Sequence, residues 1–289
     1  MKKPLAPLLL RRKAEHFLRE NGFNTLPVCP FTIAEYFEIP VEAKPATTAG
    51  VSGMLVRHGD AFGILYATHI PSLGFQRFSI AHELAHYLLE GHPEALFAGG
   101  STHTSRAGFA TKDPYEIEAD HFAAGLLMPE HLFRPAMRQV GDGLEAIEEL
   151  AEKCVTSLTA TAIRFAQAVE EPAAVVVSTG PRIDYAFLST AMQEFTGLSW
   201  PRKADFLPDG TLTDRFNADL GNVQDRKREN GEADLRAWFG TRRRIAATEE
   251  VLGLGEYGRT LTVITTDTLP DEEDEEAQFE ENWTPRHQR

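Results

Sequence analysis

The sequence predicts an α+β protein with two folded domains. Its 289 residues are enough for two hydrophobic cores, and 42% hydrophobic with 25% charged residues is typical of a globular protein. Helical patterns, a short pair of strand patterns, further helical patterns and a second group of strands follow one another along the chain. We expect a larger domain over residues 1–170, a smaller α+β domain over residues 171–270, and an acidic disordered tail over residues 271–289.

The first domain is expected to begin with two helices and a small sheet. Residues 5–22 have a helical pattern that Asn21 and Gly22 end, and residues 31–37 form a second, shorter pattern. Residues 51–56 and 61–66 are apolar runs separated by a turn with glycine and aspartate, which predicts a β-hairpin. Residues 97–114 are rich in Gly, Ser and Thr. They are expected to form a long irregular loop, a candidate lid or substrate-binding segment.

Three more helices are expected to complete the first domain. Residues 115–127 carry an apolar stripe that ends at Met128-Pro129, and residues 144–168 hold two helical patterns joined near Val155. The two helical patterns within residues 144–168 together have the length of a helix-turn-helix. Its second helix offers only Arg164 as a cation, however, so we expect an ordinary helical hairpin and no direct binding to nucleic acid. After Pro172, residues 173–178, 183–188 and 259–265 are predicted strands without a catalytic motif.

Charge and cysteine content exclude several classes of protein. The net charge is −14, and the eight acidic residues among residues 271–281 leave about −6 for the rest, which argues against a broad nucleic-acid surface. There are only two cysteines, Cys29 and Cys154, far apart in sequence, and they give neither a disulfide framework nor a C-x-x-C metal knuckle, which fits a reducing compartment. No apolar run approaches the ~20 residues of a membrane helix. The short apolar run near the N-terminus contains Pro7 and continues into basic residues, which a secretory signal peptide would not do. We therefore expect a cytoplasmic protein.

Residues 78–89, FSIAHELAHYLL, carry the strongest chemical signal in the chain. Four residues is little more than one helical turn, so His82 and His86 lie on one face and can reach one ion at the ~2.0–2.1 Å typical of zinc–nitrogen bonds. Glu83 points away from that pair and is a candidate general base. Ser79 is a candidate N-cap for the helix. A motif this short also arises by chance on amphipathic helices, so the interpretation depends on a third ligand.

Three residues compete for the place of third ligand. His92 has the spacing of the H-E-x-x-H-x-x-G-x-x-H motif, but Leu89 stands where that motif has its glycine. Glu118, on the predicted helix 115–127, is expected to face solvent. Glu116 completes a His₂Glu set, the composition of several zinc proteases, and Asp120 shares its helix face, where it can hold a ligand imidazole through its far N–H. The alternative interpretation makes Glu116 and Asp120 an exposed helix edge.

Taken together, these segments resemble the ImmA/IrrE family of zinc metallopeptidases, which implies a zincin-like domain. The resemblance rests on RFSIAHELAH, residues 77–86, followed by EIEADHFAAGLLMP, residues 116–129, and covers roughly residues 10–170. It implies that His82, His86 and Glu116 stand at zinc-binding positions and that Glu83 is the general base. Asp120 stands where the family usually has asparagine. The resemblance also implies cleavage of a DNA-binding repressor, and so a role in regulating transcription.

We therefore expect a zinc-dependent endopeptidase whose partner is a protein, a helix-turn-helix repressor, with no membrane partner. The group that stabilises the oxyanion is not identified by the sequence, and His103, Tyr115 and His121 are candidates only because they are near in sequence. Two alternatives stay open. One is a metzincin-like protease that uses His92. The other is a non-proteolytic regulatory protein with a structural metal site, which has no need of Glu83.

Overall fold

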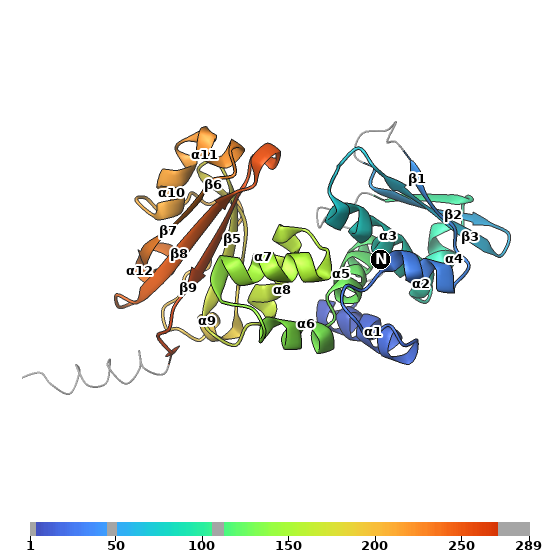
Figure 1. The fold of residues 1–289 in the computed structure, drawn as a ribbon, viewed down its shortest axis with the longest axis horizontal. Helices are drawn as coiled ribbons and strands as arrows, with labels where there is room; N and C mark the ends of the chain where they lie inside the picture. The colour runs from blue at the N-terminus through green and yellow to red at the C-terminus, as the bar shows by residue number, and fades with distance from the viewer. Residues whose placement is uncertain (1–3, 45–50, 106–112, 271–289) are drawn as a thin grey trace, which may run out of the picture. The chain divides into compact units, whose positions relative to one another are not determined.

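The computed structural model describes residues 4–44, 51–105 and 113–270, and the chain divides into two compact units. One unit comprises residues 1–141 and 148–161, and the other comprises residues 142–147 and 162–289. Each unit contains helices and one sheet (Figure 1), so the predicted α+β class is confirmed. No helix among the described residues is long and apolar enough to cross a membrane. The tail predicted over residues 271–289 lies outside the described residues.

The first unit contains a four-stranded sheet with the order β1-β3-β2-β4. Its strands are β1 (Val41–Lys44), β2 (Gly53–His58), β3 (Ala61–Ala67) and β4 (Thr102–Ser105). Strand β1 runs parallel to β3, whereas β2 pairs antiparallel with both β3 and β4. His58 pairs with Ala61 across a tight turn in which Gly59 has a φ of 63°. The predicted hairpin is therefore confirmed, and glycine suits the left-handed backbone of its turn.

Strand β4 corrects the expectation that residues 97–114 form an irregular loop throughout. It pairs with β2 so that His103 lies opposite Leu55 and Ser105 lies opposite Gly53. Threonines at positions 102 and 104 suit a strand, but four residues surrounded by glycine and serine give too short a local pattern to stand out. Pairing with β2 decides the conformation of this segment. The remainder of the proposed lid, residues 106–112, lies outside the described residues.

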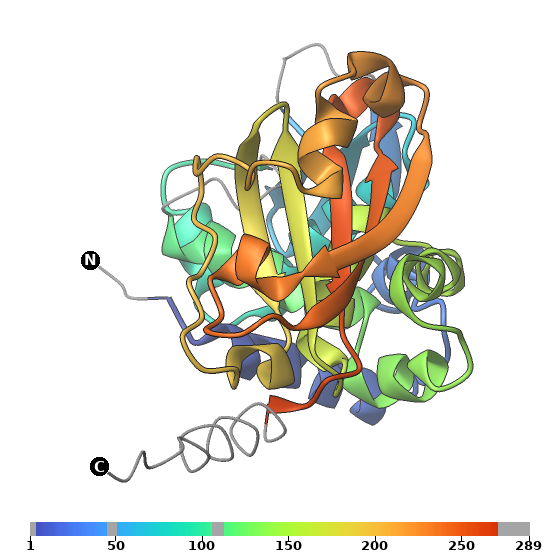
Figure 2. The ribbon, with the colours of Figure 1, turned by 90° about the vertical axis from the view of Figure 1, so that its left-hand side faces the viewer.

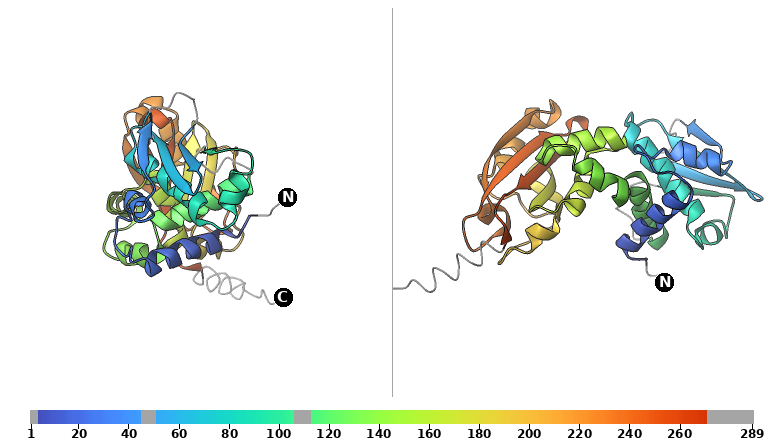
Figure 3. Two further views of the ribbon diagram at one scale, coloured as in Figure 1. Left: turned by 90° about the vertical axis from the view of Figure 1, so that its right-hand side faces the viewer. Right: turned by 60° about the horizontal axis from the view of Figure 1, so that its bottom comes forward.

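Helices of the first unit lie beside this sheet (Figure 3, left): α1 (Pro7–Glu20), α2 (Pro30–Tyr36), α3 (Leu73–Leu88), α4 (His92–Leu96), α5 (Pro114–Leu127) and α6 (Glu130–Met137). Helix α3 contacts strands β2 and β3 as well as helices α2 and α5, and α1 packs on α5. The core includes fully buried Leu10, Leu55, Leu84 and Leu126. Helix α3 is therefore held on several sides, which fixes the direction of its side chains.

Helix α3 begins earlier than the sequence pattern predicts. Ser72 is its N-cap, with a side chain that accepts a hydrogen bond from the backbone N–H of Phe75 at 3.3 Å. The prediction of Ser79 as the N-cap is wrong. Ser79 is buried within the helix, where its hydroxyl donates to the Phe75 carbonyl at 3.0 Å. A serine that bonds the preceding turn is compatible with a helix interior, so the residue type alone did not mark the boundary.

The second unit contains a five-stranded antiparallel sheet with the order β6-β5-β9-β8-β7. Its strands are β5 (Ala173–Thr179), β6 (Arg182–Leu188), β7 (Arg228–Asp234), β8 (Ala246–Gly253) and β9 (Thr260–Thr265), which confirms the three predicted strands. Helices α10 (Leu212–Asn217), α11 (Leu220–Gln224) and α12 (Leu235–Phe239) lie over one face (Figure 2), and α9 (Thr190–Gln193) contacts β5. Helices α7 (Gly143–Cys154) and α8 (Leu158–Ala168) fall at the predicted positions, and the division between the units runs through both.

Candidate metal centre

Three side chains from two helices converge in the first unit. His82 and His86 lie one turn apart on α3, and Glu116 lies in the first turn of α5. The two Nε2 atoms are 3.0 Å apart, and the Glu116 carboxylate oxygens lie 3.4 Å from His82 Nε2 and 3.3 Å from His86 Nε2. Both imidazoles are buried, whereas 12% of the Glu116 side chain is exposed. One possible ligand atom from each residue lies within 4.8 Å of the others, so this group could hold one metal ion.

The arrangement fits a divalent ion of the size of zinc. Two ligands ~2.0–2.1 Å from a tetrahedral ion lie about 3.3–3.4 Å apart, close to the separations found among these three residues. Imidazole nitrogens and a carboxylate are also ligands that zinc accepts. The donor set and its spacing therefore match such an ion, although His82 and His86 lie slightly closer together than two ligands would.

Asp120 determines which nitrogen of His82 faces the centre. The Nδ1 of His82 lies 2.9 Å from Asp120 Oδ1, and both residues are 1% exposed. A carboxylate accepts, so Nδ1 carries a proton, and in the neutral imidazole Nε2 has its lone pair on the side of Glu116 and His86. The second oxygen, Asp120 Oδ2, is buried without a hydrogen-bond partner among the described residues.

His92 and Glu118, the other two candidates for the third ligand, form a pair on the side of His86 away from Glu116. His92 Nδ1 lies 3.0 Å from His86 Nδ1, and His92 Nε2 lies 3.0 Å from Glu118 Oε2. Both ring nitrogens of His92 are therefore engaged, one with the outer nitrogen of His86 and the other with Glu118, and neither with Glu116. The expectation that Glu118 faces solvent is wrong, because this residue is 1% exposed and also accepts from the Leu5 backbone N–H at 2.9 Å. Helix α1, which packs on α5, buries a face that the α5 sequence by itself leaves polar.

Glu83 is completely buried on the side of α3 that contacts β2. Neither of its carboxylate oxygens meets hydrogen-bonding geometry with a described residue. Burial raises the pKa of Glu83 to about 7, and the nearby His82 charge and Ser105 hydroxyl offset this only in part. Gly53 of β2 makes room for this side chain, since a Cβ there would lie 2.5 Å from Glu83 Oε1. Gly53 and Ser105 were not found from the sequence, because strand pairing brings them here.

The charges of the three converging residues are strongly coupled. Burial lowers the pKa of His86 to about 3. Burial also opposes the charged form of His82, but hydrogen bonds with Asp120 and Glu116 outweigh it and raise the His82 pKa to about 10. Burial likewise opposes the charged form of Glu116, yet hydrogen bonds from His103, His82 and His86 hold its pKa far below the usual range. Glu116 is therefore a carboxylate that is ionised at neutral pH, as a metal ligand must be.

Of the three residues considered for oxyanion stabilisation, His103 contacts two residues of the converging group. Its Nε2 lies 2.9 Å from Glu116 Oε1, and its ring centroid lies 4.8 Å from that of His86. Tyr115 instead makes an edge contact with the ring of His92, with centroids 5.0 Å apart. His121 has a pKa lowered by burial and by the charge of Arg11.

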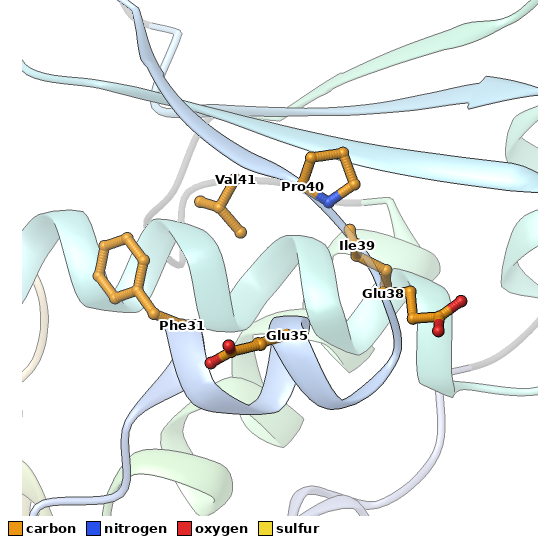
Figure 4. Close-up of a pocket in the computed structure, with 6 residues that line it drawn as sticks. All are labelled: Phe31, Glu35, Glu38, Ile39, Pro40 and Val41. Carbon is orange, nitrogen blue, oxygen red and sulfur yellow. The ribbon is translucent and has the colours of Figure 1, made fainter.

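An open hollow of about 400 Å³ lies elsewhere in the first unit, between α2 and β1 (Figure 4). It is lined by Phe31, Ile39, Pro40 and Val41, together with Glu35 and Glu38. None of the converging residues lines it, so it is not the candidate site.

Comparison with known families and proteins agrees with this geometry. The family of the IrrE N-terminal-like domain, Peptidase_M78, matches residues 19–166, which include all the residues described above for the centre except Leu5 and Arg11. Over 122 residues the chain is 30% identical to the radiation response metalloprotease IrrE of Deinococcus deserti. That match covers 42% of this chain and 39% of the relative, so the chain matches about two fifths of the relative's length.

The fold is also found in a solved structure. A Mycobacterium tuberculosis transcriptional regulator superposes with a TM-score of 0.58 at 17% sequence identity, over 89% of this chain and 76% of that one. At this identity the similarity is one of fold alone, and it extends beyond the residues that the family covers.

Proposed function

Because the chain belongs to the Peptidase_M78 family of IrrE N-terminal-like domains, we propose that it is a zinc-dependent endopeptidase that cleaves a DNA-binding transcriptional repressor. The observation that carries the proposal is the convergence of His82, His86 and Glu116, with buried Glu83 beside them. The 30% identity to a protein named as a metalloprotease supports the same chemistry. Zinc, rather than another divalent ion, is supported by the His₂Glu donor set.

In this mechanism His82, His86 and Glu116 hold the ion, and Glu83 is the general base. A bound zinc ion supplies a Lewis acid that lowers the pKa of water and polarises a carbonyl group. Glu83 accepts the proton of the attacking water and can pass it to the leaving amine. Burial raises the pKa of Glu83 above the usual range, which makes it a better proton acceptor than an exposed carboxylate. Water and the N–H of a leaving amine are donors that the Glu83 carboxylate oxygens lack among the described residues.

We also assign His103 as the second group that stabilises the developing oxyanion. It comes from β4, it is 17% exposed, and its Nε2 already lies 2.9 Å from the Glu116 carboxylate. A donor at that position can reach a carbonyl oxygen that enters beside Glu116. Tyr115 instead contacts the ring of His92.

The substrate is proposed to be one helix-turn-helix repressor in the cytoplasm, with the unit that includes residues 162–270 selecting it or sensing a signal. A cytoplasmic protease without narrow specificity would damage many proteins, so selection through a separate unit is reasonable. A regulatory binding protein with a purely structural metal site is the alternative. It does not account for Glu83, because a buried carboxylate outside the ligand set is costly unless it has a function.

The test compares metal-loaded wild-type protein with the Glu83→Gln variant in a lysate of the native host. The substitution is nearly isosteric, and an amide cannot accept the water's proton, so cleavage should fall by about 10²–10⁴-fold while the metal content stays equal. New protein N-termini that appear only with the wild type identify the substrates. A single cleaved DNA-binding protein supports the proposal. Equal cleavage by both proteins contradicts the role of Glu83, and cleavage of many unrelated proteins contradicts narrow specificity.

A further inference from the structure

Two buried residues from other helices support the outer nitrogen of His86, the one that does not face Glu116. They are His92 of α4 and Glu118 of α5. The Nδ1 of His86 lies 3.0 Å from His92 Nδ1, and the Nε2 of His92 lies 3.0 Å from Glu118 Oε2. His86 and His92 are 0% exposed and Glu118 is 1% exposed. A continuous chain of hydrogen bonds thus runs from the Glu118 carboxylate, through one imidazole, to the imidazole that faces Glu116.

The backbone after α3 places His92 in this position. Helix α3 ends at Leu88, Leu89 is extended, and Gly91 has a φ of 80°, which side-chain-bearing residues rarely adopt. His92 is then the first residue of α4. An unbroken helix would instead rotate His92 by about 120° from His86. The break turns His92 back to the far nitrogen of His86, and not to the nitrogen that faces the centre.

The chemistry of the partners sets the position of each proton along this chain. Glu118 is a carboxylate that already accepts from the Leu5 N–H at 2.9 Å, so it also accepts from His92 Nε2–H. The Nδ1 of a neutral His92 then has a lone pair and accepts from His86 Nδ1–H. His86 Nε2 is left with its lone pair directed to His82 and Glu116.

We propose that the Glu118–His92 pair is a positioning device that fixes the tautomer and ring orientation of His86, so that its Nε2 binds the metal ion. This inference rests on the proposed function, in which His86 is a ligand. His82 has a single carboxylate, Asp120, for the same purpose. Outer partners of ligand imidazoles commonly change metal affinity by about 10–100-fold when they are removed. The device is a two-residue relay, because the carboxylate of Glu118 reaches His86 only through His92.

The test measures the zinc dissociation constant of the full-length protein by competition with a chelator, after far-UV circular dichroism shows that each variant is folded. His92→Phe keeps a ring but removes the acceptor, and should weaken zinc binding by about 10–100-fold. His92→Asn returns an acceptor oxygen near the position of Nδ1, and should recover most of the loss. The matched control is His131→Phe, which removes a largely buried imidazole whose Nδ1 lies 2.9 Å from Glu15 Oε1, outside the centre.

Each outcome separates this inference from the proposed function. Wild-type affinity in His92→Phe, or an equal loss in His92→Asn and His92→Phe, overturns the relay. A wild-type protein that binds no zinc overturns the proposed function itself. If His92→Phe does not fold, the ¹⁵N shifts of His86 in the wild-type protein decide the question. A proton on Nδ1 supports the relay, and a proton on Nε2 overturns it.

Discussion

At the scale of single residues, the centre is built from buried polar groups whose partners account for their burial. His82 is paired with Asp120, and His86 is paired with His92. Glu83 differs because its oxygens have no hydrogen-bond partner among the described residues. An unpaired buried polar group typically costs about 1–3 kcal/mol of stability. Such a cost is expected at a functional site, where the missing partners are supplied by water and substrate.

Substitutions of single residues should distinguish a metal ligand from a residue that only orients a ligand, because the two lower the metal content by different amounts. Glu116→Ala removes one of three ligands and should strip most of the metal, whereas Asp120→Ala should weaken binding by about 10–100-fold without abolishing it. Elemental analysis after gel filtration measures both. Glu35→Ala is the control, because Glu35 is an exposed carboxylate that lines the hollow beside α2. Full metal content in Glu116→Ala would show that the third ligand has been assigned wrongly.

At the scale of elements, strands β2 and β4 form the wall beside the α3 motif. The register that places Gly53 opposite Ser105 brings both residues near Glu83, and it also places His103 on the same side as Glu116. The sheet therefore contributes the open space for the base and the proposed oxyanion donor. Helices α3 and α5 contribute the proposed ligands and their supports.

Gly53→Ala should disturb the base without disturbing the ligands. The new Cβ would lie 2.5 Å from Glu83 Oε1 and 3.1 Å from Glu83 Cγ, so the carboxylate must move. We expect normal metal content and a loss of activity that approaches 100-fold, since a displacement of about 1 Å at a catalytic group can have that effect.

Gly63→Ala on the neighbouring strand is the matched control. There the nearest atom to a new Cβ is Pro40 Cγ at 3.8 Å, which is ordinary contact. Steady-state kinetics on one peptide substrate compares the two variants. Similar activity in both would show that the position of Glu83 against β2 does not matter for the reaction.

At the scale of the whole molecule, the chain has two cores in two units, and the candidate centre lies entirely within one of them. The second unit holds its own cluster of buried residues, which includes Leu235, Trp238 and Phe239. The domain limits predicted at residues 170 and 171 stay a prediction. The division by contacts assigns parts of α7 and α8 to different units.

This organisation predicts that metal removal acts mainly on the first unit. Binding only to the folded state stabilises it by about 2.7 kcal/mol when the free ligand is 100 times its Kd. The three tryptophans stand at positions 200, 238 and 283 in the sequence, all after residue 161, the last residue of the first unit. A chelator should therefore lower the thermal transition seen by far-UV circular dichroism more than the transition seen by tryptophan fluorescence. Equal shifts would show that the two units unfold as one.

The sequence by itself determined the elements that local periodicity and short motifs specify. The H-E-x-x-H spacing places His82 and His86 on one helix face, and the spacing of Glu116 and Asp120 places both on one face of α5. The structure brings these four residues together. The hairpin β2–β3 and three strands of the second unit were also predicted, because alternating apolar residues and glycine turns are local signals.

Only the tertiary structure decided which groups surround this local framework. The strand at residues 102–105 forms because β2 offers it backbone partners, so its own four residues could not predict it. Glu118 is buried because α1 packs on α5, and His92 reaches His86 because the chain breaks at Leu89 and Gly91. Helical periodicity describes the face on which a side chain lies, but not the element that covers that face. The outer partners of the candidate ligands depend on such long-range packing, and for that reason they appear only in the folded chain.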